Sequence, residues 1–163
     1  MLEDAPKMRS MCRYITVIVV LLFAPIAWAQ EESWGDWAKQ CEPAGGGAER
    51  CYIIQTVQAD DRPVMVIVVA YSPQRDRIAA MIDVPLEMHL PSGLEVKAGD
   101  VSKTIAFEQC LPTGCRAMLP VDDEILEALK SGAAIAVGGK DGQSQDVQLP
   151  VSTNGFEEAF GAL

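Results

Sequence analysis

Four cysteines are the side chains whose type and spacing most clearly indicate chemistry. They form two close pairs, Cys41 with Cys51 and Cys110 with Cys115, and Pro112 and Gly114 inside the second pair predict a tight turn. Four cysteines allow three pairings, and the short separations favour the disulfides Cys41–Cys51 and Cys110–Cys115. A zinc site is the alternative, but spacings of ten and five without a nearby histidine match structural zinc sites poorly. The chain has no C-x-x-C motif, which disfavours a thioredoxin-like redox role.

Other chemistry-bearing side chains give weak signals. His89 is the only histidine, and we expect it on the polar face of a strand in a surface or hydrogen-bonding role. No G-x-S-x-G motif surrounds a serine, as many serine hydrolases would require. Asp141 and Asp146 bracket a glycine but lack the calcium-loop pattern, so a plain turn is favoured. Asp122 or Asp123 is expected to cap a helix. We therefore expect no catalytic residues, no metal site and no cofactor, and the binding residues stay unknown.

The amino-terminal segment predicts export. Basic residues precede an apolar run over residues 14–23, and the small-x-small site Ala27-Trp-Ala29 follows. This pattern predicts a secretory signal peptide over residues 1–29 and a single exported domain over residues 30–163. The run is shorter than the roughly 20 residues of a membrane-spanning helix, so we expect none in the mature chain. An uncleaved anchor is the alternative, and Met8 and Met11 are alternative starts. Cys12 falls within the signal segment.

The mature chain is strongly acidic. Residues 30–163 contain 10 Lys and Arg against 21 Asp and Glu, a formal charge of −11. Such a chain is repelled by nucleic acid and by anionic membrane surfaces, so neither is expected as a partner. The expected partner is an unknown protein or a component of the cell envelope, and the oligomeric state stays open. A length of 134 residues fits one domain with a real hydrophobic core.

Short β-branched and aromatic segments alternate with turn residues along the chain. This predicts an all-β domain, a two-layer β-sandwich with two short helices and two disulfides. The run 64–71 is apolar on both faces, which indicates a central strand. Expected strands or extended segments cover residues 34–41, 51–57, 64–71, 77–83, 86–90, 94–97, 103–107, 116–119, 133–137 and 146–149, with turns or loops at 42–49 and 138–142.

Finer expectations concern the helices, tryptophans and methionines. Helices are predicted near 122–131 and 154–161, the second with Asn154 and Glu157 at capping-box spacing. Trp34 and Trp37 are expected to be fixed by the first disulfide. Four methionines are expected to fill the core rather than to bind copper, namely Met65, Met81, Met88 and Met118.

Four motifs follow one another along the mature chain: Trp34-Gly-Asp-Trp37 with Cys41, the pair Cys110 and Cys115, the helix 125–132, and the closing segment 151–160. Their order and spacing resemble the invasion-associated locus B family of alphaproteobacteria over essentially the whole mature chain. The resemblance implies a periplasmic, outer-membrane-associated or secreted protein, linked in pathogenic members to host-cell entry. It implies no catalytic residue set. We therefore expect a non-catalytic binding, host-interaction or envelope-structural module; the alternative is an uncharacterised periplasmic enzyme or redox protein.

Overall fold

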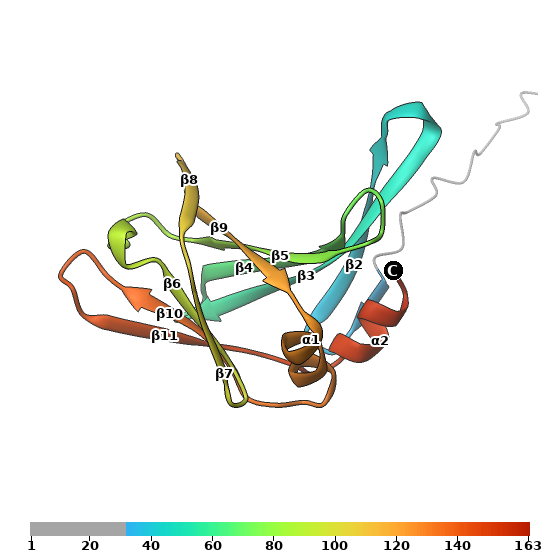
Figure 1. Cartoon of the computed structure of the whole chain (residues 1–163). Coiled ribbons are helices and arrows are strands. Elements are labelled where there is room, and N and C mark those ends of the chain that lie inside the picture. The colour runs from blue at the N-terminus through green and yellow to red at the C-terminus, as the bar shows by residue number, and fades with distance from the viewer. Residues whose placement is uncertain (1–31) are drawn as a thin grey trace, which may run out of the picture.

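The computed structural model describes residues 32–163, so the predicted signal peptide lies outside the described residues. These residues form two antiparallel sheets and two short helices (Figure 1). The strands are β1 (Glu32–Trp34), β2 (Trp37–Ala44), β3 (Ala48–Ala59), β4 (Arg62–Tyr71), β5 (Ile78–Val84), β6 (Leu94–Ala98), β7 (Val101–Ile105), β8 (Phe107–Leu111), β9 (Gly114–Val121), β10 (Ile135–Lys140) and β11 (Asp146–Val151). The helices are α1 (Asp123–Lys130) and α2 (Phe156–Gly161).

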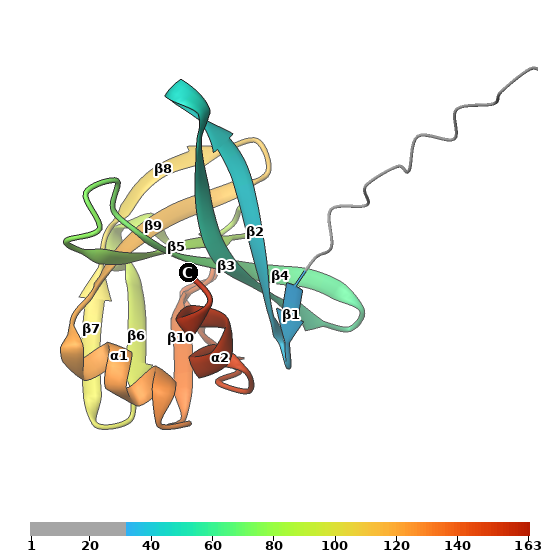
Figure 2. The same cartoon turned by 90° about the vertical axis from the view of Figure 1, so that its right-hand side faces the viewer.

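The larger sheet has seven strands in the order β1-β2-β3-β4-β5-β9-β8. Strand β4 is in the middle, which confirms the central strand predicted for the run 64–71. The sheet is strongly curved. The β2–β3 hairpin and strand β8 rise from the same side of β4 and β5 in Figure 1, and the view turned by 90° in Figure 2 shows both again. The outer face of this sheet is therefore concave.

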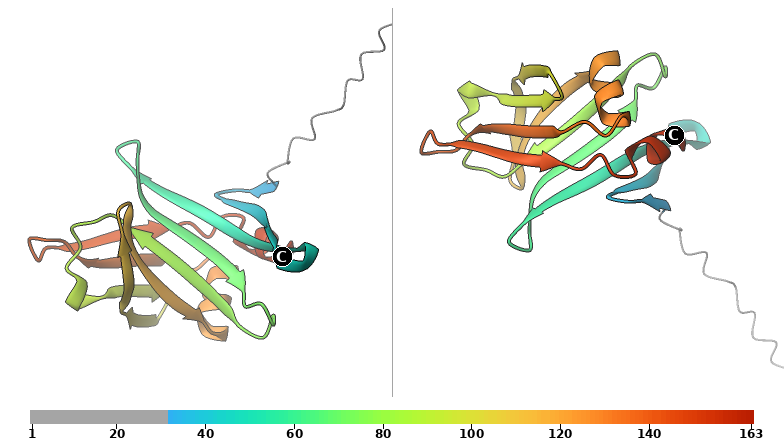
Figure 3. Two further views of the ribbon diagram at one scale, coloured as in Figure 1. Left: turned by 90° about the horizontal axis from the view of Figure 1, so that it is seen from above. Right: turned by 90° about the horizontal axis from the view of Figure 1, so that it is seen from below.

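The smaller sheet has four strands in the order β11-β10-β6-β7 and covers the opposite side of the larger one. Figure 3 shows β10 and β11 in front of the larger sheet when the molecule is seen from below. The chain passes from β7 into β8 through the single residue Ala106, so one run supplies an edge strand to each sheet. The expected strand 103–107 is thus divided between the sheets. The two layers confirm the predicted all-β sandwich.

The core lies between the two sheets and follows the period of two that strands impose on their side chains. Every second residue of the facing strands is buried, and each fully buried large apolar side chain stabilises the fold by roughly 1.5–3 kcal/mol. These residues include Ile53, Ile67, Val69, Ile82 and Leu119 from the larger sheet and Leu94, Val96, Ile135 and Val137 from the smaller one.

Helices α1 and α2 lie side by side at one end of the sandwich (Figure 2). Helix α1 begins after Asp122, whose Oδ1 accepts a hydrogen bond from the backbone N–H of Ile125 at 3.2 Å. This confirms the predicted aspartate cap. The Lys103 ammonium, which donates to the same carboxylate, and the Ile125 N–H together lower the pKa of Asp122 below its ordinary value. Ile125 and Leu129 turn inward to the core.

The predicted cap of the second helix is wrong. Helix α2 begins after Gly155, which has a φ of 80° and offers no side chain for capping. Asn154 instead places its backbone carbonyl at 3.1 Å from the N–H of Asp36, and its side-chain amide lies 3.5 Å from the carboxylate of the same residue. Asn154 therefore joins the ends of the described chain rather than beginning a helix.

The start of β2 meets the segment before α2 in a contact with a buried centre and an exposed edge at Asp36, which we call the junction, formed by Asp36, Trp37, Gln55, Ser152 and Phe156. Trp37 is 1% exposed, packs edge to face on Phe156 at 5.1 Å, and donates from Nε1 to the Ser152 carbonyl at 2.8 Å. The buried amide of Gln55 donates to the Ser152 carbonyl and accepts from its N–H, both at 3.0 Å. Ser152 Oγ donates to Asp36 at 2.6 Å. Trp37 is thus fixed by the carboxyl-terminal segment, not by the first disulfide.

Two glycines allow the backbones at the junction to come this close. A Cβ atom at Gly155 would lie 2.0 Å from the carbonyl oxygen of Trp34, and one at Gly35 would lie 2.5 Å from that of Asn154. Both glycines also have positive φ, 80° and 54°. Such positions favour glycine for two separate reasons, the steric contact and the left-handed backbone.

Several expected segments differ in the structure. Residues 86–90 are not a strand, because Glu87 has a φ of 77° and Met88 makes only an isolated bridge to Asp141. Most of the expected loop 42–49 is paired antiparallel strand. Strands β2 and β3 are paired as far as Ala44 and Ala48, and a short turn of glycines connects them. The first glycines of the expected turn 138–142 belong to β10. The turn itself begins later in the chain than expected, nearer to β11.

Candidate functional site

The concave outer face of the larger sheet contains a hollow that we call the groove. It encloses about 560 Å³, within the roughly 300–1,000 Å³ of typical small-molecule sites. Its rim carries Glu42, Arg50, Tyr52 and Arg116, and Tyr71 and Ser72 close one end. Its floor consists of six apolar side chains from four strands, namely Ile54, Val68, Ala70, Ala79, Met81 and Met118.

The floor faces outward because alternate residues of each strand point to opposite faces. Met65 is buried on the inner face of β4, so Val68 lies on the outer face of the same strand. Met81 and Met118, paired across β5 and β9, likewise face the groove and remain partly exposed. The expectation that methionines fill the core is therefore wrong for these two. Met65 is in the core, and Met88 is partly buried against it.

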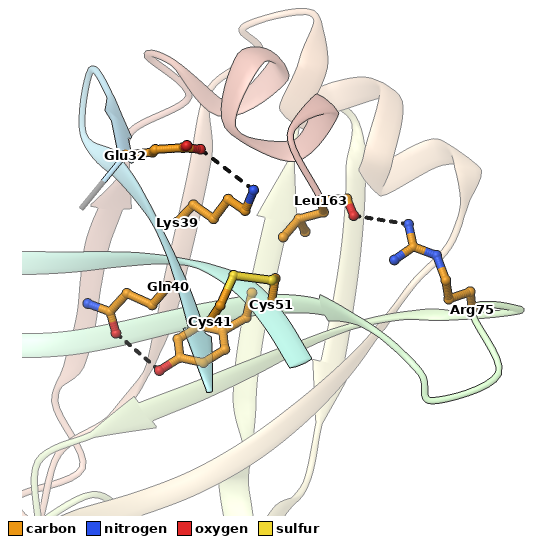
Figure 4. The surroundings of a disulfide bond; sticks show 8 residues. Glu32, Lys39, Gln40, Cys41, Cys51, Arg75 and Leu163 are labelled. Carbon is orange, nitrogen blue, oxygen red and sulfur yellow. Dashed lines mark hydrogen bonds and ion pairs between the residues drawn. A yellow bond between two sulfur atoms is a disulfide. The ribbon is translucent and has the colours of Figure 1, made fainter. Parts of the chain in front are cut away.

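One rim of the groove is held by Tyr52. Its single hydroxyl hydrogen is shared between two acceptors, Glu42 Oε1 at 2.9 Å and Gln40 Oε1 at 3.1 Å; Figure 4 shows the contact with Gln40. Burial, together with the neighbouring Glu42 carboxylate, raises the pKa of Tyr52 above its ordinary value. The phenol therefore stays protonated and acts as a fixed donor to this rim.

The other rim carries a bidentate ion pair. Arg116 donates from Nε and from an η nitrogen to the two carboxylate oxygens of Asp83, both at 2.7 Å. The two residues are directly paired across β9 and β5. The hydrogen bonds to Asp83 raise the pKa of Arg116. Two parallel charge-assisted bonds fix the orientation of both side chains, so this rim is neutral and preorganised.

A smaller hollow of about 230 Å³ adjoins the groove, and we call it the side hollow. It lies between the β2–β3 hairpin and the β4–β5 loop, and it shares Arg50, Tyr71 and Ser72 with the groove. Arg75 also lines it, with its guanidinium 4.5 Å from the centre of the Tyr71 ring. The same guanidinium donates to Leu163 O at 3.1 Å (Figure 4). Arg50, Tyr71 and Ser72 therefore form the border between the two hollows.

The four cysteines form the disulfides Cys41–Cys51 and Cys110–Cys115. Each links directly opposed residues of a hairpin, with Cα atoms 4.0 Å apart. One bridge therefore lies in the β2–β3 hairpin and the other in the β8–β9 hairpin. Figure 4 shows the first bridge, and its Cys51 lines the side hollow. These hairpins border the groove at its two sides.

The remaining candidates for chemistry lie apart from the groove. His89 is exposed in a loop, not on a strand, and its Nδ1 lies 2.7 Å from Ser92 Oγ. Asp141 accepts hydrogen bonds from the backbone N–H groups of Gln143 and Gln145, which is an ordinary aspartate turn. Asp146 pairs with Lys140 instead. Within residues 32–163 no three His, Cys, Asp or Glu side chains are placed to hold a metal ion.

The outer face of the smaller sheet contrasts with the groove. It has a hollow of about 360 Å³ lined mostly by charged and polar side chains. The charges are paired, Lys97 with Glu95 at 3.1 Å and Lys140 with Asp146 at 2.8 Å. The hydrogen bond from Lys140 lowers the pKa of Asp146. This face is an ordinary solvated surface.

Comparison with known proteins gives the family. A model described as invasion associated locus B (IalB) protein matches residues 37–163. The chain belongs to this family. An invasion protein B homolog of Brucella abortus strain 2308 is 26% identical over 136 residues, covering 82% of this chain and 78% of that protein. A homolog in B. abortus biovar 1, strain 9-941, matches equally.

A solved structure of the family has the same fold. The crystal structure of invasion associated protein B from Bartonella henselae matches with a TM-score of 0.73 and 20% sequence identity, covering 81% of this chain and 92% of that one. The IalB family is named for invasion, not for an enzyme activity. Family membership and two disulfides are consistent with an exported protein. In the part of the chain that the structure describes, neither helix has the length and apolar character to cross a membrane.

The groove was not predicted from the sequence, although a signal for it was present. The run around Val64–Tyr71 is apolar at consecutive positions, so both faces of this strand are apolar. The smaller sheet covers only one of those faces. A strand with two apolar faces in a two-layer sandwich leaves one of them on the surface, which is the groove floor.

Proposed function

We propose that the protein is an exported, non-catalytic binding module of the cell envelope or of the secreted fraction, and that the groove is its binding surface. The observation that carries this proposal is the apolar floor on the outer face of the central strands. Concave apolar surfaces of this size on soluble proteins are typical of binding sites. The two disulfides in the bordering hairpins support an exported location and a rigid rim.

The alternative is an uncharacterised periplasmic enzyme or redox protein. Neither the groove nor the side hollow is lined by a histidine or by a free cysteine. Asp83 and Arg116 form an ion pair with each other, so neither side chain is directed at a reacting group. A binding role uses the apolar floor directly, and the rim carboxylate of Glu42 is already engaged by the Tyr52 hydroxyl.

The groove is tested with the neutral apolar dye N-phenyl-1-naphthylamine, whose fluorescence rises in apolar sites. The purified mature chain should bind the dye saturably. Met81→Glu places a charge on the floor and should weaken dye binding at least about ten-fold, since a buried unpaired charge is costly. Thr104→Glu adds the same charge to the exposed outer face of the smaller sheet and should leave dye binding unchanged.

Melting temperatures of the variants separate loss of binding from loss of folding. Met118→Thr gives a milder floor change if Met81→Glu does not fold. Equal dye binding by wild type and both floor variants would refute the groove as the binding surface. Signal-peptide cleavage is tested separately by mass spectrometry of the protein from the producing cell, where a mature chain beginning at Gln30 is expected and an intact amino-terminus contradicts cleavage.

A further inference from the structure

Arg50, on the β2–β3 hairpin, differs from most basic side chains of this acidic protein. Among the lysine and arginine side chains of residues 32–163, only those of Arg50 and Arg62 make no hydrogen bond, ion pair or ring contact. Arg62 lies at the β3–β4 turn and lines neither the groove nor the side hollow. Arg50 lines both. An unpaired guanidinium at an apolar hollow is a binding group for an anion.

The nearest carboxylate on the neighbouring strand does not neutralise Arg50. Glu42 is its direct partner across β2 and β3, so the two side chains leave the sheet on the same face. Glu42 instead accepts the hydroxyl of Tyr52 at 2.9 Å and makes no ion pair within 4.0 Å. Glu49 also lines the side hollow and likewise makes no recorded ion pair. The guanidinium of Arg50 therefore keeps its donors for a ligand.

The position of Arg50 indicates how a ligand would lie. Arg50 lies at the rim of the groove, near the end that Tyr71 and Ser72 close. The floor consists of aliphatic side chains and thioethers, and the Arg50 guanidinium and the Ser72 hydroxyl lie at its polar border. This sequence of surfaces matches a molecule with an extended apolar chain and one anionic end.

We propose that the groove binds a free long-chain carboxylate of the fatty-acid class, with its alkyl chain on the floor around Met81 and Met118 and its carboxylate at Arg50. This inference rests on the proposed function of the groove. Methionine side chains are flexible and polarisable, and they adapt to chains of different length and curvature. A carboxylate matches the planar fork of a guanidinium.

A membrane surface is a poorer occupant on two grounds. The floor lies between the raised β2–β3 hairpin and β8 (Figure 1), where a flat bilayer does not reach. The whole chain carries a formal charge of −10, which repels an anionic bilayer. A single carboxylate feels the local Arg50 more strongly than distant acidic groups that salt screens.

The test displaces N-phenyl-1-naphthylamine from the mature chain with single-chain amphiphiles below their micelle concentrations. Dodecanoate should displace the dye, and hexanoate should be far weaker, because each buried methylene contributes roughly four-fold in affinity. Dodecyltrimethylammonium has the same tail with a cationic head. General attraction to an acidic protein favours this cation, so a preference for dodecanoate has to come from the local arginine.

Two matched variants locate the carboxylate. Arg50→Gln should weaken dodecanoate about ten-fold, as loss of a charge-assisted hydrogen bond predicts, once displacement is corrected for the dye affinity of the same variant. Arg62→Gln removes the other unpaired arginine, which lines neither hollow, and should change neither dodecanoate affinity nor dye binding. Equal displacement by the two heads, or equal losses in both variants, would overturn the inference. Binding to anionic phosphatidylglycerol vesicles that depends on Arg50 would also overturn it, in favour of a membrane lipid.

The outcomes separate this inference from the proposed function beneath it. If Met81→Glu removes dye binding but the protein shows no preference for dodecanoate, the carboxylate ligand is refuted. The groove then remains the binding surface. Dye binding that Met81→Glu does not affect refutes the groove itself.

Discussion

The junction and the groove lie on the two faces of the same sheet and use similar residue types in opposite ways. In the junction, Trp37 and Phe156 are almost completely buried, and the buried amide of Gln55 is bonded on both sides. Within the described residues no buried side-chain nitrogen or oxygen lacks a hydrogen-bond partner. In the groove, apolar side chains remain partly exposed, and Arg50 has no partner.

This difference separates stability from binding. In a buried contact whose polar groups are all paired, no group is available to bind a ligand. An exposed apolar floor beside an unpaired cation has groups available for binding. The junction also joins Trp37, the first residue of the family match, to Phe156 near its end. The junction explains why motifs so distant in sequence occur together, and the groove is where a partner can bind.

The largest expected effect comes from emptying the junction. Phe156 is 0% exposed and contacts the rings of Trp37 and Phe160. Phe156→Ala should lower the free energy of unfolding by about 3–5 kcal/mol, a large part of the roughly 5–15 kcal/mol of a typical domain. Urea denaturation measures this change. Met81→Ala in the groove is the control and should cost about 1 kcal/mol or less, because its side chain lies partly exposed on the outer face. Comparable losses would erase the distinction between the two regions.

The disulfides give the next largest effect, and they belong to the groove border. Replacing Cys110 and Cys115 together by serine should cost about 2 kcal/mol, since the bridge closes a short loop of the unfolded chain. Thermal unfolding with and without reductant measures the loss. We expect no reactive thiol in the native oxidised protein. A native-state thiol that alkylates readily at either residue would move the redox alternative to first place.

Much of the fold was predictable from residue patterns. Alternating side chains predicted most strands, and the run 64–71, apolar on both faces, predicted the central strand. Asp122 predicted the start of α1. The errors arose where a local pattern lacked its tertiary partner. Residues 86–90 alternate like a strand, but the positive φ of Glu87 prevents a regular ladder. Asn154 has capping-box spacing, yet its carbonyl is used by Asp36 across the junction.

The groove was harder to predict because it depends on which face of the larger sheet the smaller one covers. Met81 and Met118 are identical in type to Met65, and only strand register decides that two of them face outward. The unpaired state of Arg50 is likewise not readable from sequence. Its cross-strand neighbour Glu42 is a natural ion-pair partner, and only the structure places Tyr52 on that carboxylate.

A smaller effect is expected at Asp122, which belongs to neither region. Asp122→Ala removes the cap of α1 and should cost about 1 kcal/mol. The folded state lowers the pKa of this carboxyl, so its contribution is present above the ordinary aspartate pKa of about 4 and is lost as the pH falls through the folded-state pKa. The difference between wild type and variant should therefore be constant from about pH 5 to 8 and shrink in more acid solution. A gap that persists unchanged at pH 2 would contradict the capping role.

The smallest effect is expected at His89, outside both the junction and the groove. Its exposed ring contacts Ser92 in a loop that contributes no residue to either region. His89→Ala should change the free energy of unfolding by about 0.5 kcal/mol or less and should leave dye and dodecanoate binding unchanged. This variant also tests the separation of stability from binding, because His89 is the only imidazole available for acid–base catalysis. If the purified protein turned over a substrate, and His89→Ala abolished turnover at an unchanged melting temperature, the binding-module proposal would be wrong and the enzyme alternative would replace it.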